Sequence, residues 1–385
     1  MLKIPNISHR VETDRFGPFT FQVGLNATDL LLPWIRVEDA HKRFIATPLS
    51  QVASELEREV LVQSVHGTNT IEGAQLTEQQ TADVLDRAPK DIAAEQEIRV
   101  RNIKAAYDLA LRSAVNPNWR FDIDFMHAIH AEISRDLPHT DNRPGLVRDN
   151  PKDKITYVGD EAHGGNYKPP QYRGDILLLL QGLVEWHAQL VKAEIPALIR
   201  APLVHFYFEC IHPFWDGNGR TGRVLEATLL RQAGYRYAPF ALSRYYLDNI
   251  DLYFTLFNTC RKAQEKNREF PNQDFVAFHL DGMLPVIERL HDRVNRLVGL
   301  VLFRAQVVAM VQDGRLNTRQ WAIVDRILDE GKPVALEALQ REPGYIALYD
   351  KKTKRTRDRD LSGLREHKLL RLRQDGKLGP WFVGE

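Results

Sequence analysis

The stretch HPFWDGNGRTGR, residues 212–223, decides how this chain of 385 residues is interpreted, because it joins two helical runs through a glycine-containing loop. An apolar run comes before it and VLEATLLRQAG follows it. Gly217 and Gly219 allow the backbone to curl with its N–H groups pointing inward, where the following helix presents its own unpaired donors. The stretch therefore predicts an anion site suited to phosphate oxygens.

Charged side chains complete this predicted site. Arg220 and Arg223 stand three residues apart at the start of the following helix, so both guanidinium groups can reach the outer phosphates of a nucleotide. Asp216 comes just before the glycines and is placed to hold Mg²⁺, which favours one carboxylate together with phosphates and waters. At the edge of such a site, His212 can accept the proton of an attacking hydroxyl, a role that imidazoles often have at neutral pH.

The twelve residues resemble the signature of the Fic family, in which a histidine, a phenylalanine, an acid-glycine-asparagine-glycine run and two arginines hold fixed positions. Every fixed position is matched, including Asn218 between the two glycines. No lysine follows the second glycine, so the stretch is neither a Walker A loop nor the variant of the phosphate-transferring Doc relatives. The resemblance implies an enzyme that transfers AMP from ATP, with Mg²⁺, to a Ser, Thr or Tyr hydroxyl of a target protein.

The same resemblance assigns a role to each residue of the site. His212 would be the catalytic base and Asp216 the metal ligand. Tyr253 and Phe254, in DLYFTLF, resemble the aromatic pair that faces adenine. The implied nucleotide contacts are Gly217, Asn218, Gly219, Arg220, Arg223, Tyr253 and Phe254.

A second match lies upstream, at TNTIEG, residues 68–73, which resembles the inhibitory helix of the family. Thr68 and Glu72 lie on one helical face, just before Gly73. In the family this glutamate pairs with the second arginine of the signature, here Arg223, and excludes the γ-phosphate of ATP. The resemblance implies a self-inhibited enzyme. The alternative, that Gly73 simply ends a helix as its C′ residue, stays open.

The sequence KITYVGDEAHGGNYKPP, residues 154–170, contains two short β-prone runs around a Gly-rich turn and predicts a hairpin. With the preceding RPGLVR, residues 143–148, it resembles the flap that clamps a target peptide. An edge formed by Ile155, Thr156 and Tyr157 would hold an extended chain through main-chain hydrogen bonds. The alternative that these are ordinary hairpin residues stays open.

The rest of the chain predicts a mainly α protein of two or three domains. We expect a Fic-type helical core with a β-hairpin flap, followed by a C-terminal winged-helix-like domain, and only an extended arm over residues 1–50. Helices are expected over 54–73, from Thr77, and over 91–113, 122–136, 174–192, 197–210 and 220–233. The expected domains are residues 1–115, an N-terminal arm and helical region with the inhibitory helix, residues 116–295, the catalytic core, and residues 296–385, the winged-helix-like domain.

Composition excludes some classes of partner. The 52 basic and 51 acidic side chains give the whole molecule no field that favours nucleic acid or membrane. Cys210 and Cys260 are too few for a disulfide framework, which favours a reducing cytoplasm. The first residues lack a signal-peptide pattern, and no stretch approaches the apolar length that spans a bilayer, so a soluble cytoplasmic protein without membrane contact is expected.

The basic run over residues 351–373 leaves an alternative function open. Such a run can follow a nucleic-acid backbone, but it can also be a solvated helix face, and winged helices also bind proteins. The chain could then be a transcriptional regulator whose Fic module only senses a nucleotide. Removal of AMP by the same site is a third hypothesis. The sequence leaves open the target, the release of inhibition, and whether the protein forms a homodimer.

Overall fold

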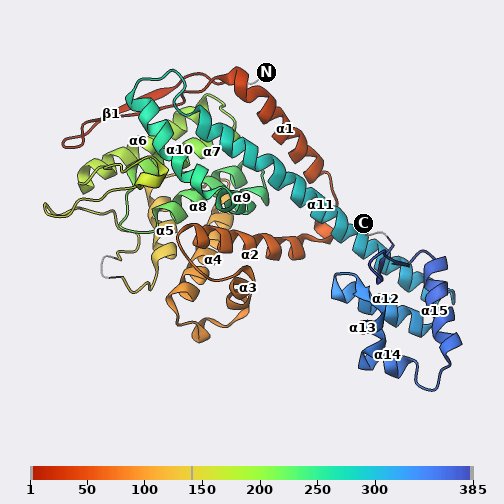
Figure 1. Ribbon diagram of the computed structural model, residues 1–385. Coiled ribbons are helices and arrows are strands. Elements are labelled where there is room, and N and C mark those ends of the chain that lie inside the picture. The colour runs from red at the N-terminus through yellow and green to blue at the C-terminus, as the bar shows by residue number, and fades with distance from the viewer. Residues whose placement is uncertain (1–2, 140–141, 382–385) are drawn as a thin grey trace. The chain divides into compact units, whose positions relative to one another are not determined.

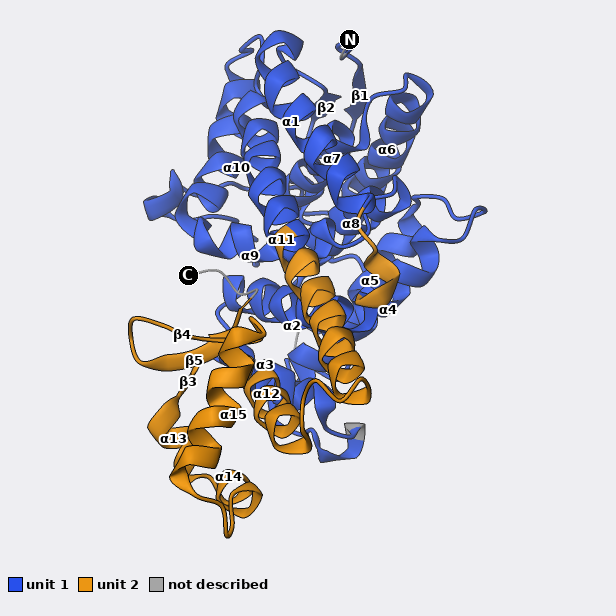
Figure 2. Ribbon diagram, turned by 90° about the vertical axis from the view of Figure 1, so that its right-hand side faces the viewer, with its two compact units in different colours: residues 1–46, 53–291 blue, residues 47–52, 292–385 orange. Residues whose placement is uncertain are grey.

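The computed structural model describes residues 3–139 and 142–381, and these form two compact units (Figure 2). The first unit contains the described residues up to 46 and residues 53–291, and the second contains residues 47–52 and the described residues from 292 onward. The division into domains at residues 115 and 295 that we expect from the sequence stays a prediction.

The first unit is built mainly from helices, with one two-stranded hairpin (Figure 1). Its elements are β1 (Ser8–Glu12), β2 (Pro18–Gln22), α1 (Ala27–Ile45), α2 (Ala53–Ile71), α3 (Glu78–Asp86), α4 (Glu95–Ala114), α5 (Ile123–Ser134), α6 (Arg173–Lys192), α7 (Ala197–Ile211), α8 (Asn218–Gln232), α9 (Ala238–Asp248), α10 (Ile250–Glu265) and the first part of α11 (Gln273–Gln312). The mainly helical class and each helix expected from the sequence are confirmed, with ends that differ by a few residues.

The expectation of an extended arm over residues 1–50 was wrong. The strands β1 and β2 pair in an antiparallel register, and Phe21 of β2 is fully buried against Trp186. Helix α1 then begins at an Asn26 cap and buries four apolar side chains, Leu30, Val37, Ala40 and Phe44. Pro33 inside the helix, together with a buried face of only four side chains, hides the helical period from a reading of the sequence.

Helices α7 and α8 form the centre of this unit. Thirteen of the fifteen residues of α7 are buried, and twelve of the fifteen residues of α8. A helix that is apolar on all sides belongs in the interior, as the run from Ala197 to Ile211 indicates. The loop that joins these two buried helices is residues 212–217, so its backbone is anchored at both ends.

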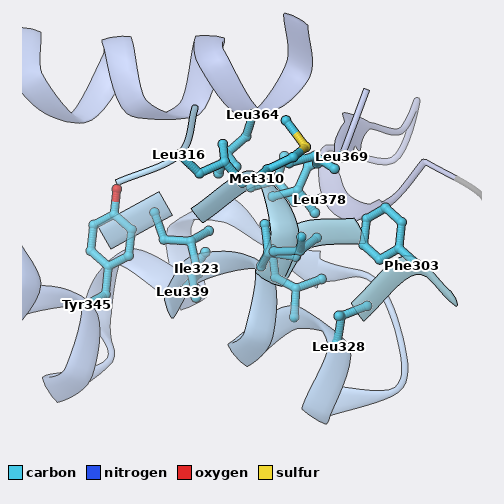
Figure 3. Close-up of a cluster of buried hydrophobic side chains, with 14 of the residues drawn as sticks. Phe303, Met310, Leu316, Ile323, Leu328, Leu339, Tyr345, Leu364, Leu369 and Leu378 are labelled. Carbon is cyan, nitrogen blue, oxygen red and sulfur yellow. The ribbon is translucent and has the colours of Figure 1, made fainter. Parts of the chain in front are cut away.

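The second unit contains the end of α11 and a small sheet. Its other elements are α12 (Thr318–Glu330), β3 (Val334–Ala335), α13 (Leu336–Arg341), α14 (Pro343–Leu348), α15 (Lys354–Glu366), β4 (Leu370–Leu372) and β5 (Lys377–Pro380). The strands are antiparallel in the order β3-β5-β4. Buried side chains from Phe303 to Leu378 form one core (Figure 3). The winged-helix interpretation of this unit stays a prediction.

Within the described residues, one helix is long and apolar enough to cross a membrane, by length and composition only. This helix is α11, whose most apolar window has a mean hydropathy of 1.6 and is 28% buried. The expectation that no stretch approaches this length was therefore wrong. In the first unit, α11 buries Phe275, Met283 and Ile287 in the protein core.

Candidate functional site

The loop between α7 and α8 is held in a sharply turned conformation. His212 ends α7 in the left-handed region, with φ 49° and ψ 62°, which is uncommon for a residue other than glycine. Gly217, with φ 78°, begins α8. Asn218, the first residue of α8, accepts a hydrogen bond from the Phe214 amide at 2.9 Å and donates one to the Phe214 carbonyl at 2.8 Å. The Asn218 amide thus braces the loop.

Two residues that the sequence did not reveal fix this loop from neighbouring segments. Arg148 is fully buried and donates from Nε to the His212 carbonyl at 2.8 Å. The ring of His130 stacks on Phe214 with centroids 3.7 Å apart. Its Nδ1 accepts from the Gly145 amide at 3.0 Å, so Nε2 carries the proton and donates to a loop carbonyl at 3.0 Å. Burial lowers the pKa of His130 to about 4, which keeps the ring neutral.

Arg220 and Asp216 form an ion pair across the first turn of α8. The distance from Arg220 Nη2 to Asp216 Oδ2 is 2.8 Å, and the guanidinium is 1% exposed while the carboxylate is 51% exposed. Burial raises the pKa of Asp216, but the Arg220 charge and the Gly217 N–H outweigh burial and lower it below its usual value. Nε and Nη1 of Arg220 have no hydrogen-bond partner among the described residues. Buried donors of this kind can bind an anion.

Arg223, by contrast, has all its nitrogens bonded. Its Nε donates to Thr68 Oγ1 at 2.7 Å, and its Nη2 donates to the Thr68 carbonyl at 3.1 Å and to Glu72 Oε1 at 2.6 Å. Its Nη1 donates to the Tyr253 hydroxyl at 3.3 Å. Burial lowers the pKa of Arg223, but Tyr253 and Glu72 outweigh burial and raise it. The predicted contact of Glu72 with Arg223 is present, Thr68 of α2 adds a second one, and Gly73 follows with a φ of 83°.

A cavity of about 290 Å³ brings six of the predicted site residues together. It is lined by Glu72, Val158, Gly159, Asp160, His163, Tyr167, Glu209, Cys210, His212, Gly219, Arg223, Tyr253, Phe254, Phe257, Asn258 and Arg261. Asp216 and Gly217 of the adjoining loop, and Asn218 and Arg220 in the first turn of α8, lie outside this lining. A Cβ atom on Gly219 would collide with Glu72 Oε1, so any other residue at this position would displace the Glu72 carboxylate.

The predicted flap is less regular than a hairpin. Its two runs are joined by a single antiparallel bridge, Val158 with Tyr167, and the turn contains a 3-10 helix, Glu161–His163. Asn258 of α10 donates to the carbonyls of His163 at 3.0 Å and Gly165 at 2.8 Å, which holds the turn beside the cavity. Asn258 is a third residue that the sequence did not reveal, although it lies four positions after Phe254.

The three positions of the expected flap edge differ in their surroundings. Ile155 is 48% exposed and Tyr157 is 59% exposed. The Thr156 amide instead donates to Gln171 Oε1 at 2.8 Å. The Thr156 main chain is therefore already bonded, whereas Ile155 and Tyr157 present exposed side chains.

Within the cavity, His212 faces a carboxylate. Its Nδ1 lies 3.6 Å from Oε2 of Glu209, one turn earlier on α7. Neither Nδ1 of His212 nor Oε1 of Glu209 has a hydrogen-bond partner among the described residues. An imidazole beside a carboxylate is an arrangement that can accept and hold a proton. Glu209 gave no signal in the sequence because glutamate is common on helices.

The described residues contain no group of three His, Cys, Asp or Glu side chains that could hold a metal ion by themselves. Mg²⁺ does not need such a group, since one carboxylate with phosphates and waters suits it. The half-exposed carboxylate of Asp216, near the end of the loop, fits that pattern.

Together the fold and the site define a class of protein. It is a helical domain in which a glycine-containing loop precedes the buried helix α8, and Glu72, just after α2, pairs with Arg223, the second arginine of α8. The model of the Fic/DOC family matches residues 120–230. This segment, which contains α7, the loop and most of α8, belongs to the Fic/DOC family.

Known proteins resemble the chain over part of their length. The "Protein adenylyltransferase Fic" of Drosophila ananassae is 28% identical over 183 residues, which are 46% of this chain and 34% of that protein. The chain thus spans about a third of the length of this curated relative. A Fic family protein from Desulfovibrio desulfuricans shares the fold with a TM-score of 0.54 and 18% identity, over 92% of this chain and 97% of that one. Fic-1 from C. elegans, residues 134–508, gives 0.53 and 20%, over 70% and 76%.

Proposed function

We propose that this protein is a protein adenylyltransferase, which transfers AMP from ATP to a Ser, Thr or Tyr hydroxyl of a target protein and is restrained by Glu72. The observation that carries the proposal is the shared cavity: His212, Gly219 and Arg223 of the signature line it together with Tyr253 and Phe254. The name of the Drosophila relatives, protein adenylyltransferase, supports it.

In the proposed reaction, His212 takes the proton of the target hydroxyl. The hydroxyl oxygen then forms a bond to the α-phosphorus of ATP, while the bond between this phosphorus and the bridging oxygen breaks and pyrophosphate leaves. The N–H groups from Gly217 to Gly219 and the free donors of Arg220 stabilise the charge on the phosphates. Asp216 would hold Mg²⁺, which, when bound, neutralises part of the negative charge of the phosphates.

The flap would bring the target to this base. Val158, Gly159 and Asp160 line the cavity beside His212, and Ile155 and Tyr157 are exposed on the same segment. A target segment that lies along the flap would place its hydroxyl near His212 while few of its side chains are recognised. The identity of the target is therefore not encoded in the cavity alone.

The proposed self-inhibition follows from the hydrogen bonds that Arg223 already makes. Arg223 already bonds Thr68, Glu72 and Tyr253, so its charge is not available to the outer phosphates of ATP. ATP would then bind without the alignment that in-line transfer needs. We infer that activation requires Glu72 to leave Arg223.

The direct test is incubation of the purified protein with α-labelled ATP and Mg²⁺, alone and with cell lysate, followed by mass spectrometry. Label that becomes covalently attached, as an AMP adduct on a hydroxyl side chain, supports the proposal. Label from γ-labelled ATP should stay in pyrophosphate. Attachment of the γ-label, or no adduct in both the wild-type protein and the Glu72→Gly variant, would refute it. Release of AMP from a pre-labelled target would favour AMP removal.

A DNA-binding role of the second unit is a second candidate function. Helix α15 begins after the Thr353 cap and carries five Lys or Arg residues between 354 and 365, and it buries only Asp360 and Leu364. Binding that weakens steeply with salt and selects one sequence would support this role. A cytoplasmic location and a homodimer remain predictions from the sequence.

A further inference from the structure

A second cavity, of about 380 Å³, lies in the first unit and shares no lining residue with the first. Its walls come from α2, the end of α3, α4, the last turn of α8, the segment between α8 and α9, and the beginning of α9. The volume falls in the range of small-molecule sites, about 300–1,000 Å³. Helix α2, the helix that ends in the Glu72 contact, therefore has a cavity along its earlier turns.

The interior of the second cavity is apolar and partly aromatic. The side chains that give it this character are Val60, Leu61, Leu85, Tyr107, Leu111 and Phe240. Val60, Tyr107 and Phe240 are buried, so they form fixed walls. A ligand with a flat apolar body would cover the apolar surface that lines the cavity. The free energy gained is proportional to the apolar area that is covered.

The charged side chains around this cavity are paired, with one exception. The pairs are Arg58 with Asp86 at 2.7 Å, Lys104 with Asp108 at 2.7 Å and Arg236 with Glu57 at 3.2 Å. Arg231, in the last turn of α8, has no hydrogen bond or ion pair with another described residue, and its Nε is buried. Burial and the like charge of Arg236 lower the pKa of Arg231. An anion in the cavity would relieve both effects.

A short series of polar side chains also connects the second cavity to the Glu72 contact. At its floor, Ser64 donates to the Tyr107 hydroxyl at 2.7 Å and accepts at its carbonyl from Ser243 at 3.1 Å. The Tyr107 hydroxyl in turn interacts with Thr68. Thr68 accepts from Arg223 Nε at 2.7 Å. The wall of the second cavity is thus two side chains away from the inhibitory pair.

We propose that the second cavity is a regulatory site for a small organic anion with an aromatic body, such as an aromatic carboxylate, which pairs with Arg231. The cavity exists in the arrangement in which Glu72 holds Arg223. A ligand that fills the cavity stabilises this arrangement relative to arrangements in which α2 has moved. Because Glu72 then stays on Arg223, the ligand slows AMP transfer. The effect on activity rests on the proposed function, whereas binding does not.

Binding is tested on the full chain with 2-naphthoate and its neutral analogue 2-naphthalenemethanol, by isothermal titration calorimetry. The wild-type protein should bind the anion about tenfold or more tightly than the alcohol, since a bond between charged partners contributes about 1.5–3 kcal/mol. Arg231→Gln should abolish this preference and Arg231→Lys should retain part of it. Arg244→Gln, which changes an exposed arginine outside the cavity, is the matched control.

Leu61→Trp, which fills the cavity, should weaken binding of both compounds. Thermal unfolding followed by circular dichroism verifies that each variant is folded. No binding to the wild-type protein, equal binding of acid and alcohol, or an unchanged preference in folded Arg231→Gln would overturn the proposal.

Activity provides the second measurement. Saturating 2-naphthoate should slow self-modification severalfold in the wild-type protein but not in Glu72→Gly, which should still bind it. Arg231→Gln should have the basal rate and no response. An unchanged or faster wild-type rate at saturation overturns the regulatory role. If no variant transfers AMP while naphthoate binding still depends on Arg231, the adenylyltransferase proposal fails and the anion site stands.

Discussion

The two ends of α8 carry arginines that meet α2 in opposite ways. Near the start of α8, Arg223 is buried and bonded by Thr68, Glu72 and Tyr253. In its last turn, Arg231 lies beside a cavity and has no such bonds within the described part of the chain. We call the start of α8, where Arg223 pairs with Glu72, the closed end. The last turn of α8, where Arg231 borders the second cavity, is the open end. In the proposed function the closed end restrains the enzyme, and in the proposed regulation the open end binds the ligand that strengthens this restraint.

The largest change in rate is expected at His212, and it tests whether the closed end contains an active site. His212→Ala should lower the rate of self-modification by about 10²–10⁴-fold, because a general base contributes that much to a transfer reaction. It should leave ATP affinity and thermal stability close to those of the wild-type protein. Single-turnover assays with α-labelled ATP measure the rate. An undiminished rate in the folded variant would remove His212 from the mechanism.

Opening the closed end should activate the enzyme. Glu72→Gly removes the carboxylate that holds Arg223, so the rate should rise about tenfold to a hundredfold, in line with the 1.5–3 kcal/mol of a hydrogen bond between charged groups. Glu72→Gln, which keeps the size and loses the charge, should give an intermediate rise. The double variants with His212→Ala and with Arg223→Ala should both be slow. A rate at or below wild type in folded Glu72→Gly would leave TNTIEG as packing only.

A substitution of Thr68 at the closed end should have a smaller effect on the rate than Glu72→Gly. Thr68→Val keeps the shape of a fully buried side chain but removes the acceptor of Arg223 Nε. It should lower the free energy of unfolding by about 1–3 kcal/mol, the usual cost of a buried unpaired polar group. The rate should rise less than in Glu72→Gly. Urea unfolding and the transfer assay measure both, and an unchanged unfolding curve would mean that the Thr68 hydroxyl contributes little.

The smallest effect concerns the loop of the closed end and its pH dependence. Burial places the pKa of His130 at about 4 in the folded protein, below its unfolded value. The unfolded chain therefore binds more protons below pH 6.5, and the folded state loses stability as the pH falls from 6.5 towards 4. Relative to His130→Gln, the wild-type protein should lose about 1 kcal/mol at pH 5.5. Urea unfolding between pH 7 and 5 measures this, and parallel curves would contradict it.

The short-range features of the site could be predicted from the sequence. The turn at Gly217, the helix that begins at Asn218 and the end of α2 near Gly73 depend on neighbours within a few residues. Glycine conformation, capping and helical spacing are local properties, so residues 212–223 and 68–73 are enough to specify them. The predicted hairpin and N-terminal arm were less accurate because weak local preferences there are overridden by packing.

Only the tertiary structure decided which distant groups meet. Arg223 finds its acceptors on α2, more than 150 positions away in the chain, and Asn258 finds carbonyls of the flap more than 90 positions away. His130 and Arg148 look like ordinary helix and loop residues until the fold places them against the loop. The unpaired state of Arg231 is equally invisible in the sequence. Whether a buried charge has a partner depends on the packing of whole helices, which no local spacing specifies.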